Sequence, residues 1–178
     1  AAGNVSTRAT LTAATAACAT DPVVAIAGDI AGDGTGDSAT AALLDSLQPT
    51  AVLTAGDNAY PDGSLSQYNA YYDPTWGRHK GLTFPTPGNH EYSTSGAAGY
   101  FRYFGSRAGV PGEGWYSYDL GSWHLISLNS ELEHDAGSEQ VTWLKNDLAA
   151  TGARCVVAYW HKPRFTAGNY SDMSEFQP

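Results

Sequence analysis

The stretch "TAVLTAGDNAY" (50–60) decides how this chain folds. Its apolar run "TAVLT" (50–54) predicts a buried strand. The strand leads at once into Gly56 and Asp57, and Tyr60 follows closely after the aspartate. A turn would explain Gly56 and Asp57, but it would not explain why other buried strands of the chain also end on residue types that bind metal ions.

The segments before this strand complete a β-α-β unit. "VVAIAGDI" (23–30) is a short β-branched run that ends in Gly-Asp, and it predicts another buried strand. "DSATAALLDSLQP" (37–49) predicts a helix that Asp37 or Ser38 caps and that Pro49 ends. Two strands joined by one helix are expected to lie parallel, with a right-handed crossover.

Three segments extend the pattern beyond residue 60. Ser64 and Gln67 fit a capping box before a short helix at 68–72. "GLTFPTPGNHEY" (81–92) predicts a third strand that prolines cut short. "GWYSYDLGSWHLISLNS" (114–130) alternates between apolar and polar residues around a glycine and predicts a β-hairpin.

A helix and a strand end the predicted order of elements. Ser138 is expected to cap a helix over 139–150. The side chains expected to face the core from this helix are Val141, Leu144 and Leu148. "RCVVAYWH" (154–161) predicts the last buried strand.

Composition limits the partners that the protein can bind. The chain has 178 residues, of which 42% are apolar and 15% charged, and its formal net charge is −9. That length is typical of one domain and is enough to bury a core. The negative charge argues against nucleic acid and anionic membranes as partners. An anionic substrate would need local cations, which bound metal ions can supply.

The start of the chain and its composition favour secretion. Residues 1–20 are small and polar, and we interpret them as a mature N-terminal tail or an interdomain linker before a single domain at 21–178. Low Lys content and a large share of Ser, Thr, Asn and Gly agree with an exported protein. Cys18 and Cys155 are the only cysteines, and they either form one disulfide or remain buried thiols.

Polar residues close four of the predicted strands. They are Asp29, Asp57 with Tyr60, the run 89–91 (Asn-His-Glu), and His161. Functional groups gather at the carboxyl ends of strands in a parallel α/β sheet, so these residues are expected to converge. Carboxylate, phenol, amide and imidazole groups together suit divalent or trivalent transition metals. Each piece alone is weak, because a Gly-Asp after a strand is usually a turn, but the combination predicts a metal site.

These motifs resemble those of the calcineurin-like metallophosphoesterases. The family's series runs Asp, Gly-Asp, Gly-Asn-His-Asp/Glu, His, and Gly-His-x-His. Most members carry a ligand histidine two residues after the first aspartate, where this chain has Ala31. "GDNAY" (56–60) looks instead like the purple acid phosphatase branch, in which a tyrosine at the position of Tyr60 replaces that histidine. The resemblance covers 23–168 and implies an α/β fold, a metallophosphoesterase-type β-sandwich with flanking helices.

The resemblance also implies a dinuclear metal centre, Fe(III) plus a divalent metal (Zn, Fe or Mn). Asp29, Asp57 and Tyr60 would hold the iron. Asp57 would bridge to the second metal, which Asn89 and His161 also bind. A metal-bound hydroxide would then attack the phosphorus of the substrate in line with the leaving group.

A catalytic acid is implied next to the metals. His90 would contact the phosphate and protonate the leaving oxygen, and Glu91 would orient His90. Plant members of the branch carry a histidine pair in the loop after the fourth motif. This chain has Asn169, Tyr170 and Ser171 there.

The family's Gly-His-x-His motif is absent from the sequence. Residues 21–178 are therefore interpreted as the N-terminal portion of a metallophosphoesterase catalytic domain, incomplete at the C-terminus. This chain alone is expected to lack one histidine ligand at each metal, and a C-terminal fragment that completes the domain is an expected partner.

Three functions remain open at this point. The first is a secreted acid phosphatase acting on phosphomonoesters. The second is a phosphodiesterase or phospholipase D-like hydrolase with a small-molecule or lipid substrate, for which "YNAYYDPTW" (68–76) would form an apolar rim unless it packs as an amphipathic helix. The third is an inactive fragment that acts as a binding or structural module. Hydrolysis of a monoester and a diester distinguishes the first two, and metal content tests the third.

Overall fold

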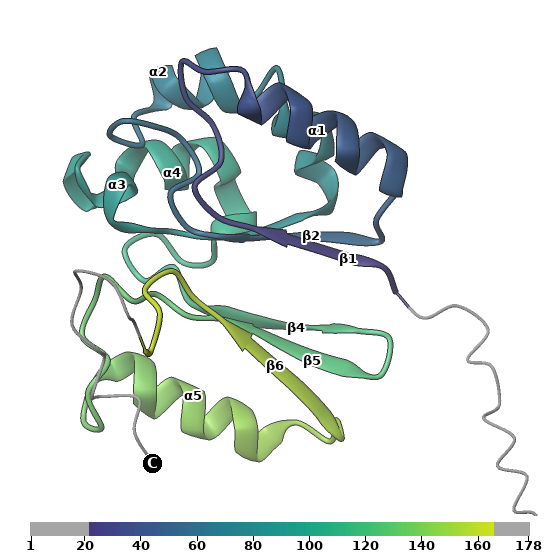
Figure 1. The fold of residues 1–178 in the computed structure, drawn as a ribbon. Coiled ribbons are helices and arrows are strands. Elements are labelled where there is room, and N and C mark those ends of the chain that lie inside the picture. The colour runs from purple at the N-terminus through teal and green to yellow at the C-terminus, as the bar shows by residue number, and fades with distance from the viewer. Residues whose placement is uncertain (1–21, 166–178) are drawn as a thin grey trace, which may run out of the picture.

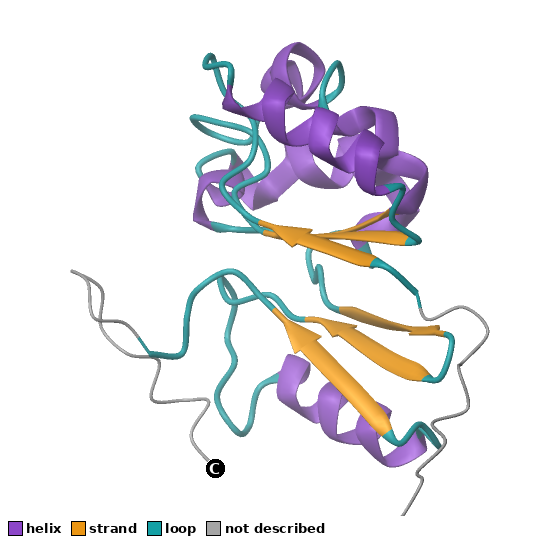
Figure 2. Cartoon of the chain, turned by 45° about the vertical axis from the view of Figure 1, so that its right-hand side comes forward, coloured by secondary structure: helices purple, strands orange, loops and turns teal. Residues whose placement is uncertain are grey.

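Two three-stranded sheets lie face to face in the computed structural model, which describes residues 22–165 (Figure 1). Helices α1 to α4 cover the outer face of the first sheet, and α5 covers the outer face of the second (Figure 2). The elements, in chain order, are β1 (Val24–Ala27), α1 (Gly36–Leu47), β2 (Ala51–Ala55), α2 (Leu65–Gln67), a π-helical turn (Tyr68–Tyr72), a 3-10 helix (Trp76–Leu82), β3 (Thr83–Thr86), α3 (Asn89–Tyr92), a 3-10 turn (Ser95–Ala97), α4 (Ala98–Phe104), a 3-10 turn (Gly105–Ala108), β4 (Tyr116–Leu120), β5 (Trp123–Ser127), α5 (Glu139–Ala150) and β6 (Cys155–Tyr159). The predicted β-sandwich with flanking helices is confirmed.

The first sheet has the order β1-β2-β3, and all of its strands are parallel. The predicted β-α-β unit is therefore confirmed, although β1 is shorter than the run 23–30 that predicted it. Successive residues of β2 serve opposite faces, since Val52 packs among the helices while Leu53 packs between the sheets. A strand buried on both faces explains why its sequence is almost wholly apolar.

The second sheet contains the predicted hairpin. Strands β4 and β5 are antiparallel around Gly121, whose φ of 62° suits a tight turn. Strand β6 then pairs with β5 in parallel after α5. Ser138 caps α5 as predicted, because its hydroxyl accepts a hydrogen bond from the N–H of Val141 at 3.2 Å.

The predicted inward face of α5 is wrong in part. Val141 and Leu144 are only half-buried, and Leu148 is 44% exposed. The buried residue of α5 is Gln140, whose side-chain amide pairs with both backbone groups of Asn129 at 2.7 and 2.9 Å. This helix is thus anchored at its first turn by hydrogen bonds, and its apolar stripe covers the sheet less completely than the pattern suggests.

Two predicted helix caps are also wrong. Helix α1 begins after Thr35, and the carboxylate of Asp37 accepts a hydrogen bond from the neighbouring Ser38 N–H instead of capping the helix. The side chain of Ser64 makes no capping hydrogen bond, and the Gln67 side chain accepts from the N–H of Asp62. Both errors have a similar cause, because Asp37 binds the N–H of Ser38 and Ser64 Oγ lies 3.0 Å from Ser66 Oγ, so each side chain has another partner nearby.

Side-chain contacts hold the two sheets in register with each other. The hydroxyls of Thr86 and Ser127 lie 2.6 Å apart, and Tyr159 donates to the Phe84 carbonyl at 3.3 Å. The rings of Phe84 and Tyr118 stack with centroids 3.8 Å apart. These contacts set where the segment after β6 lies relative to the ends of β2 and β3.

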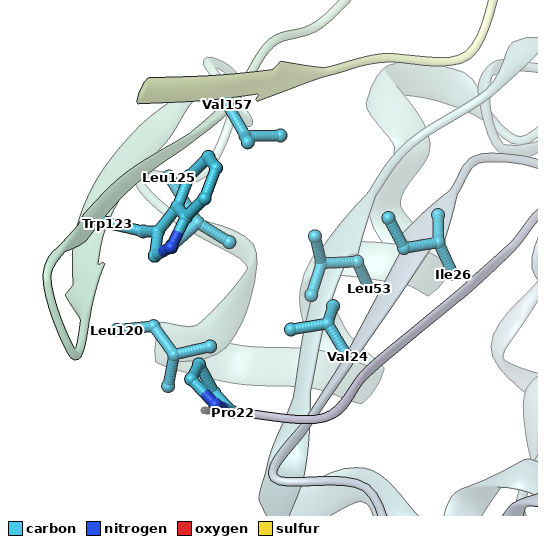
Figure 3. Close-up of a pocket in the computed structure, with 8 residues that line it drawn as sticks. All are labelled: Pro22, Val24, Ile26, Leu53, Leu120, Trp123, Leu125 and Val157. Atoms are coloured by element: carbon cyan, nitrogen blue, oxygen red, sulfur yellow. The ribbon is translucent and has the colours of Figure 1, made fainter. Parts of the chain in front are cut away.

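An apolar cavity of about 480 Å³ lies between the sheets near the start of β1 (Figure 3). Its lining residues are Pro22, Val24, Ile26, Leu53, Leu120, Trp123, Leu125 and Val157. Strands β1 and β6 are edge strands among the described residues, and Ile26 is 56% exposed. None of the predicted site residues lies in this cavity.

Several expectations fall partly outside the described residues. The tail 1–20 and residues 169–171 are outside them. Cys155 is half-buried at the start of β6, but Cys18 lies outside the described range, so the disulfide stays a prediction. Among residues 22–165, the helices lack the length and apolar character needed to span a bilayer.

A buried histidine on β5 makes stability depend on pH. Both ring nitrogens of His124 face carboxylates, with Nδ1 2.7 Å from Asp119 Oδ1 and Nε2 2.8 Å from Asp147 Oδ2. Hydrogen bonds to Asp147 and Asp119 raise its pKa, against a smaller opposing effect of burial. Since carboxylates only accept hydrogen bonds, both ring nitrogens must donate, and the imidazolium form is favoured.

We expect His124→Gln to lower the free energy of unfolding by about 1.5 kcal/mol at mildly acidic pH, the value of a hydrogen bond to a charged group. A histidine whose pKa is raised by folding contributes fully below its unfolded pKa of about 6.5 and loses that contribution as pH rises through the folded pKa. Urea unfolding of both proteins from mildly acidic to alkaline pH measures the difference. His79→Gln is the control, and a His124 difference that does not shrink at alkaline pH would contradict the expectation.

Candidate metal centre at the strand ends

The predicted site residues converge at the carboxyl ends of β1, β2, β3 and β6. They border one cavity of about 550 Å³ between the two sheets. Its lining residues are Gly28, Asp29, Ala55, Asp57, Tyr60, Asn89, His90, His161, Lys162 and Pro163. All five predicted metal ligands and the predicted catalytic histidine are among them, and their roles stay predictions.

The loops after β1 and β2 bring together two carboxylates and a phenol. Tyr60 donates its hydroxyl proton to Asp29 Oδ1, and the same hydroxyl oxygen lies 3.1 Å from Asp57 Oδ2. The two loops run alongside each other, because the N–H of Ile30 donates to the Asp57 carbonyl at 2.9 Å. Since one phenol proton can serve only one carboxylate, three oxygen atoms crowd together with a single proton among them.

A second group of predicted metal ligands also includes Asp57. His161 Nε2 lies 3.1 Å from Asn89 Oδ1 and 3.4 Å from Asp57 Oδ2. Its other nitrogen, Nδ1, is 2.8 Å from the carbonyl oxygen of Ala55, an acceptor that requires Nδ1 to carry a proton. The neutral tautomer of His161 therefore has its lone pair on Nε2, where a metal ligand needs it.

His90 lies beside the cavity with one nitrogen committed to the backbone. Its Nδ1 is 2.5 Å from the carbonyl oxygen of Pro61 and so acts as a donor. Its Nε2 lies 3.8 Å from Asp57 Oδ2, and its ring packs against Tyr60 with centroids 4.4 Å apart. This leaves Nε2 as the nitrogen of His90 that can exchange a proton with a bound molecule.

The expected contact between Glu91 and His90 is wrong. Glu91 is fully buried and accepts hydrogen bonds from the backbone N–H groups of Asp57 and Gly88 at 2.9 and 2.8 Å. The reason lies in helix α3, which begins at Asn89 and places Glu91 at its third position, with its side chain turned back toward the start of the helix.

Two glycines allow the backbone to pack this closely. A Cβ added to Gly88 would lie 2.3 Å from Asp57 Oδ1, and one added to Gly56 would lie 2.6 Å from the His161 ring. The left-handed conformation is found at Gly56 and also at the aspartates themselves, with φ of 55° at Asp29 and 52° at Asp57. Aspartate tolerates this conformation better than most residues, but it persists only where the surroundings hold it.

Burial and neighbouring groups shift the pKa values of several ionisable side chains in the site. Burial raises the pKa of Asp57, but hydrogen bonds from His161 and from the His90 N–H outweigh it and lower the pKa below its ordinary value. Burial lowers the pKa of His161, yet its hydrogen bonds to Asp57 and to the Ala55 carbonyl raise the net pKa to about 9. Burial and the neighbouring Asp29 carboxylate raise the pKa of Tyr60 well above its ordinary value.

The side-chain atoms that line the cavity suit a bound cation, because several of them are hydrogen-bond acceptors that face other acceptors. Tyr60 and Asp57 face each other through oxygens, and His161 Nε2 faces two oxygens, so the cavity wall carries more acceptors than protons. Among residues 22–165, no group of three or more His, Cys, Asp and Glu side chains is arranged to hold a metal ion. The five residues form two sets of donors only when the Tyr60 phenol and the Asn89 amide are counted.

Sequence reasoning did not identify Lys162, which lines the cavity and pairs with Glu131 at 2.7 Å. No local pattern marks it, apart from its position directly after His161. It also did not identify the contact of Glu91 with the Asp57 loop. Only the contact of Glu91 with Gly88 had a local signal, because these two residues have the spacing of an N-cap and the third helix position.

Comparisons with known proteins agree with this architecture. The family model of the calcineurin-like phosphoesterases matches residues 22–177. Purple acid phosphatase 15 of Arabidopsis thaliana is 34% identical over 56 residues, which are 30% of this chain and 10% of that protein. The structure of a purple acid phosphatase isolated from yellow lupin (Lupinus luteus) seeds matches 81% of this chain and 31% of its own, with a TM-score of 0.63 and 19% identity. The chain thus spans only a minor part of the length of either relative.

Proposed function

This chain belongs to the calcineurin-like phosphoesterase family, and from that premise we propose that the protein is a metal-dependent phosphoester hydrolase, an acid phosphatase that acts on phosphomonoesters. One observation carries the proposal. Asp57 Oδ2 lies within 3.4 Å of both the Tyr60 hydroxyl and His161 Nε2, so one carboxylate oxygen is shared by two sets of donors. A carboxylate placed in this way could serve two metal ions.

The residues would divide between two metal ions. Asp29, Tyr60 and Asp57 would hold the first, for which we propose Fe(III), because a phenolate suits a trivalent ion. Asp57, Asn89 and His161 would hold the second, a divalent Zn, Fe or Mn ion. When bound, such a centre supplies the nucleophile at moderate pH and neutralises charge on the phosphoryl oxygens.

The remaining side chains would bind and protonate the substrate. His90 presents Nε2 to the cavity, where it would hold a phosphoryl oxygen and deliver a proton to the leaving oxygen. Because the chain carries a net charge of −9, a phosphate would be attracted only by local positive charge, which the proposed metal ions and a protonated His90 would supply. Lys162 lies in the same wall, although Glu131 already balances its charge.

The apolar rim considered for a diester or lipid substrate is wrong. Tyr68, Tyr72 and Trp76 are buried in the core between the first sheet and its helices. This agrees with the alternative that the segment packs as an amphipathic helix. No other described feature favours a diester, which remains an outcome of the test below. Secretion and a C-terminal fragment that completes the domain remain proposals that rest on the sequence.

Metal analysis and two substrates test the proposal. The purified protein is expected to hold bound metal and to hydrolyse para-nitrophenyl phosphate faster than bis(para-nitrophenyl) phosphate. A visible absorption band that disappears in Tyr60→Phe would identify the phenolate on iron. Faster hydrolysis of the diester would favour the phosphodiesterase. Absence of both metal and hydrolysis would overturn the proposal in favour of a binding or structural module.

A further inference from the structure

A buried carboxylate binds the backbone next to the candidate metal centre. Glu91 Oε2 accepts hydrogen bonds from the N–H groups of Asp57 and Gly88, at 2.9 and 2.8 Å. Its Oε1 accepts from the N–H of Asn58 at 2.8 Å, from that of Ala59 at 3.3 Å and from the Tyr68 hydroxyl at 3.1 Å. Four of these five contacts are backbone N–H donors, which favour the anionic form, whereas burial raises the pKa of Glu91.

The four backbone donors come from two different loops. Asp57, Asn58 and Ala59 follow β2, whereas Gly88 follows β3 and precedes α3. Backbone N–H groups buried without a partner are costly, and here four of them point at one side chain. Glu91 therefore joins the two strand-end loops that also carry Asp57 and Asn89.

The conformation of Asp57 depends on this contact. Its φ of 52° is a conformation that the surroundings must enforce, and its N–H is fixed by Glu91. Its carboxylate is held at the other end, because Oδ1 accepts from the His90 N–H at 2.9 Å. With both ends fixed, Oδ2 is the oxygen that faces Tyr60 and His161.

We propose that Glu91 is a positioning residue that holds Asp57 in its shared orientation by binding the backbone of both strand-end loops from below. It touches neither substrate nor metal in this role. The inference rests on the proposed function, because the orientation matters only if Asp57 serves two metal ions.

Glu91→Gln tests the proposal by replacing one acceptor oxygen with an NH2 group. That group would face the backbone donors, so the loops could not keep their present positions. We expect the variant to fold and its dissociation constant for Zn²⁺ to rise by about 10- to 100-fold, the range for residues that orient metal ligands. Calorimetric titration of the metal-stripped purified protein with Zn²⁺ measures it, and circular dichroism checks the fold.

Two control variants separate positioning from general destabilisation. Tyr68→Phe removes a single neutral donor from the same carboxylate and leaves its four backbone contacts, so Zn²⁺ affinity should stay close to that of the parent. Leu44→Ala removes buried apolar volume from α1, so it should lower Tm without changing Zn²⁺ affinity. A merely structural role for Glu91 predicts that Glu91→Gln behaves like Leu44→Ala.

Measurements on the parent protein and on a second variant distinguish failure of the proposed function from failure of the proposed role of Glu91. Failure of the parent to bind Zn²⁺ would count against the proposed function itself. A folded Glu91→Gln variant with parental Zn²⁺ affinity would overturn only the role of Glu91. Should Glu91→Gln not fold, Glu91→Asp decides, because it keeps the charge but is too short to reach both loops. Parental affinity in Glu91→Asp would then overturn the inference.

Discussion

Asp57→Asn is expected to remove the metal centre while leaving the fold intact. The change keeps the size of the side chain but removes the charge that both donor sets share through Oδ2. Substitution of a residue that only orients a metal ligand lowers metal affinity by about 10- to 100-fold, so substitution of a shared ligand should lower it further. We expect kcat/KM for para-nitrophenyl phosphate to fall on the order of 10³-fold or more, since even one lost contact to developing charge costs about 10²- to 10³-fold.

Metal content per chain and kcat/KM, measured on the same preparations, check this expectation. The matched control is Asp45→Asn, which removes an exposed carboxylate on α1 that pairs with Arg78 at 2.7 Å. Exposed ion pairs contribute about 1 kcal/mol or less, so the control should keep its metal and its activity. If Asp57→Asn retains metal at the parental level, Asp57 does not serve two ions, and the assignment of both donor sets is wrong.

His90→Asn is expected to lower kcat while leaving metal content unchanged. Nδ1 of His90 is held by the Pro61 carbonyl, so only Nε2 can transfer a proton. Loss of a positioned general acid lowers the rate by about 10²- to 10⁴-fold when the leaving group needs a proton to depart. We therefore expect a large fall with an alkyl phosphate and a small fall with para-nitrophenyl phosphate, whose leaving oxygen needs little protonation.

Steady-state kinetics with both esters, together with metal analysis, separate the possible roles of His90. His79→Asn is the control, because that histidine pairs with Asp45 of α1 and does not line the cavity. Equal losses with both esters would show that His90 does not protonate the leaving group. Loss of metal would show instead that His90 is a ligand.

The predicted strands and their order were correct where a local pattern decides the structure. Apolar runs with β-branched residues located β1, β2 and β6, and alternation located the β4–β5 hairpin. Hydrophobic periodicity succeeds there because burial of each face repeats along a single segment. The caps near Asp37 and Ser64 failed because each of these polar side chains had alternative partners within a few residues.

The sequence by itself determined which chemical groups stand at the strand ends. Asp29, Asp57, Tyr60, Asn89 and His161 could be chosen from residue type and position alone, and their motifs identified the family before any contact was known. This works because a glycine-aspartate turn after a buried strand is a local feature. It places a functional group at the end of a strand without reference to the rest of the molecule.

Only the tertiary structure decided how these groups meet. His161 comes from the second sheet, and its contacts with Ala55 and Asn89 span 106 and 72 residues of sequence. They exist because side chains between the sheets, such as Tyr159, fix one sheet on the other. The position of Glu91 beneath Asp57 was equally invisible, since a buried carboxylate is stabilised by backbone donors from a loop that no local pattern connects to it.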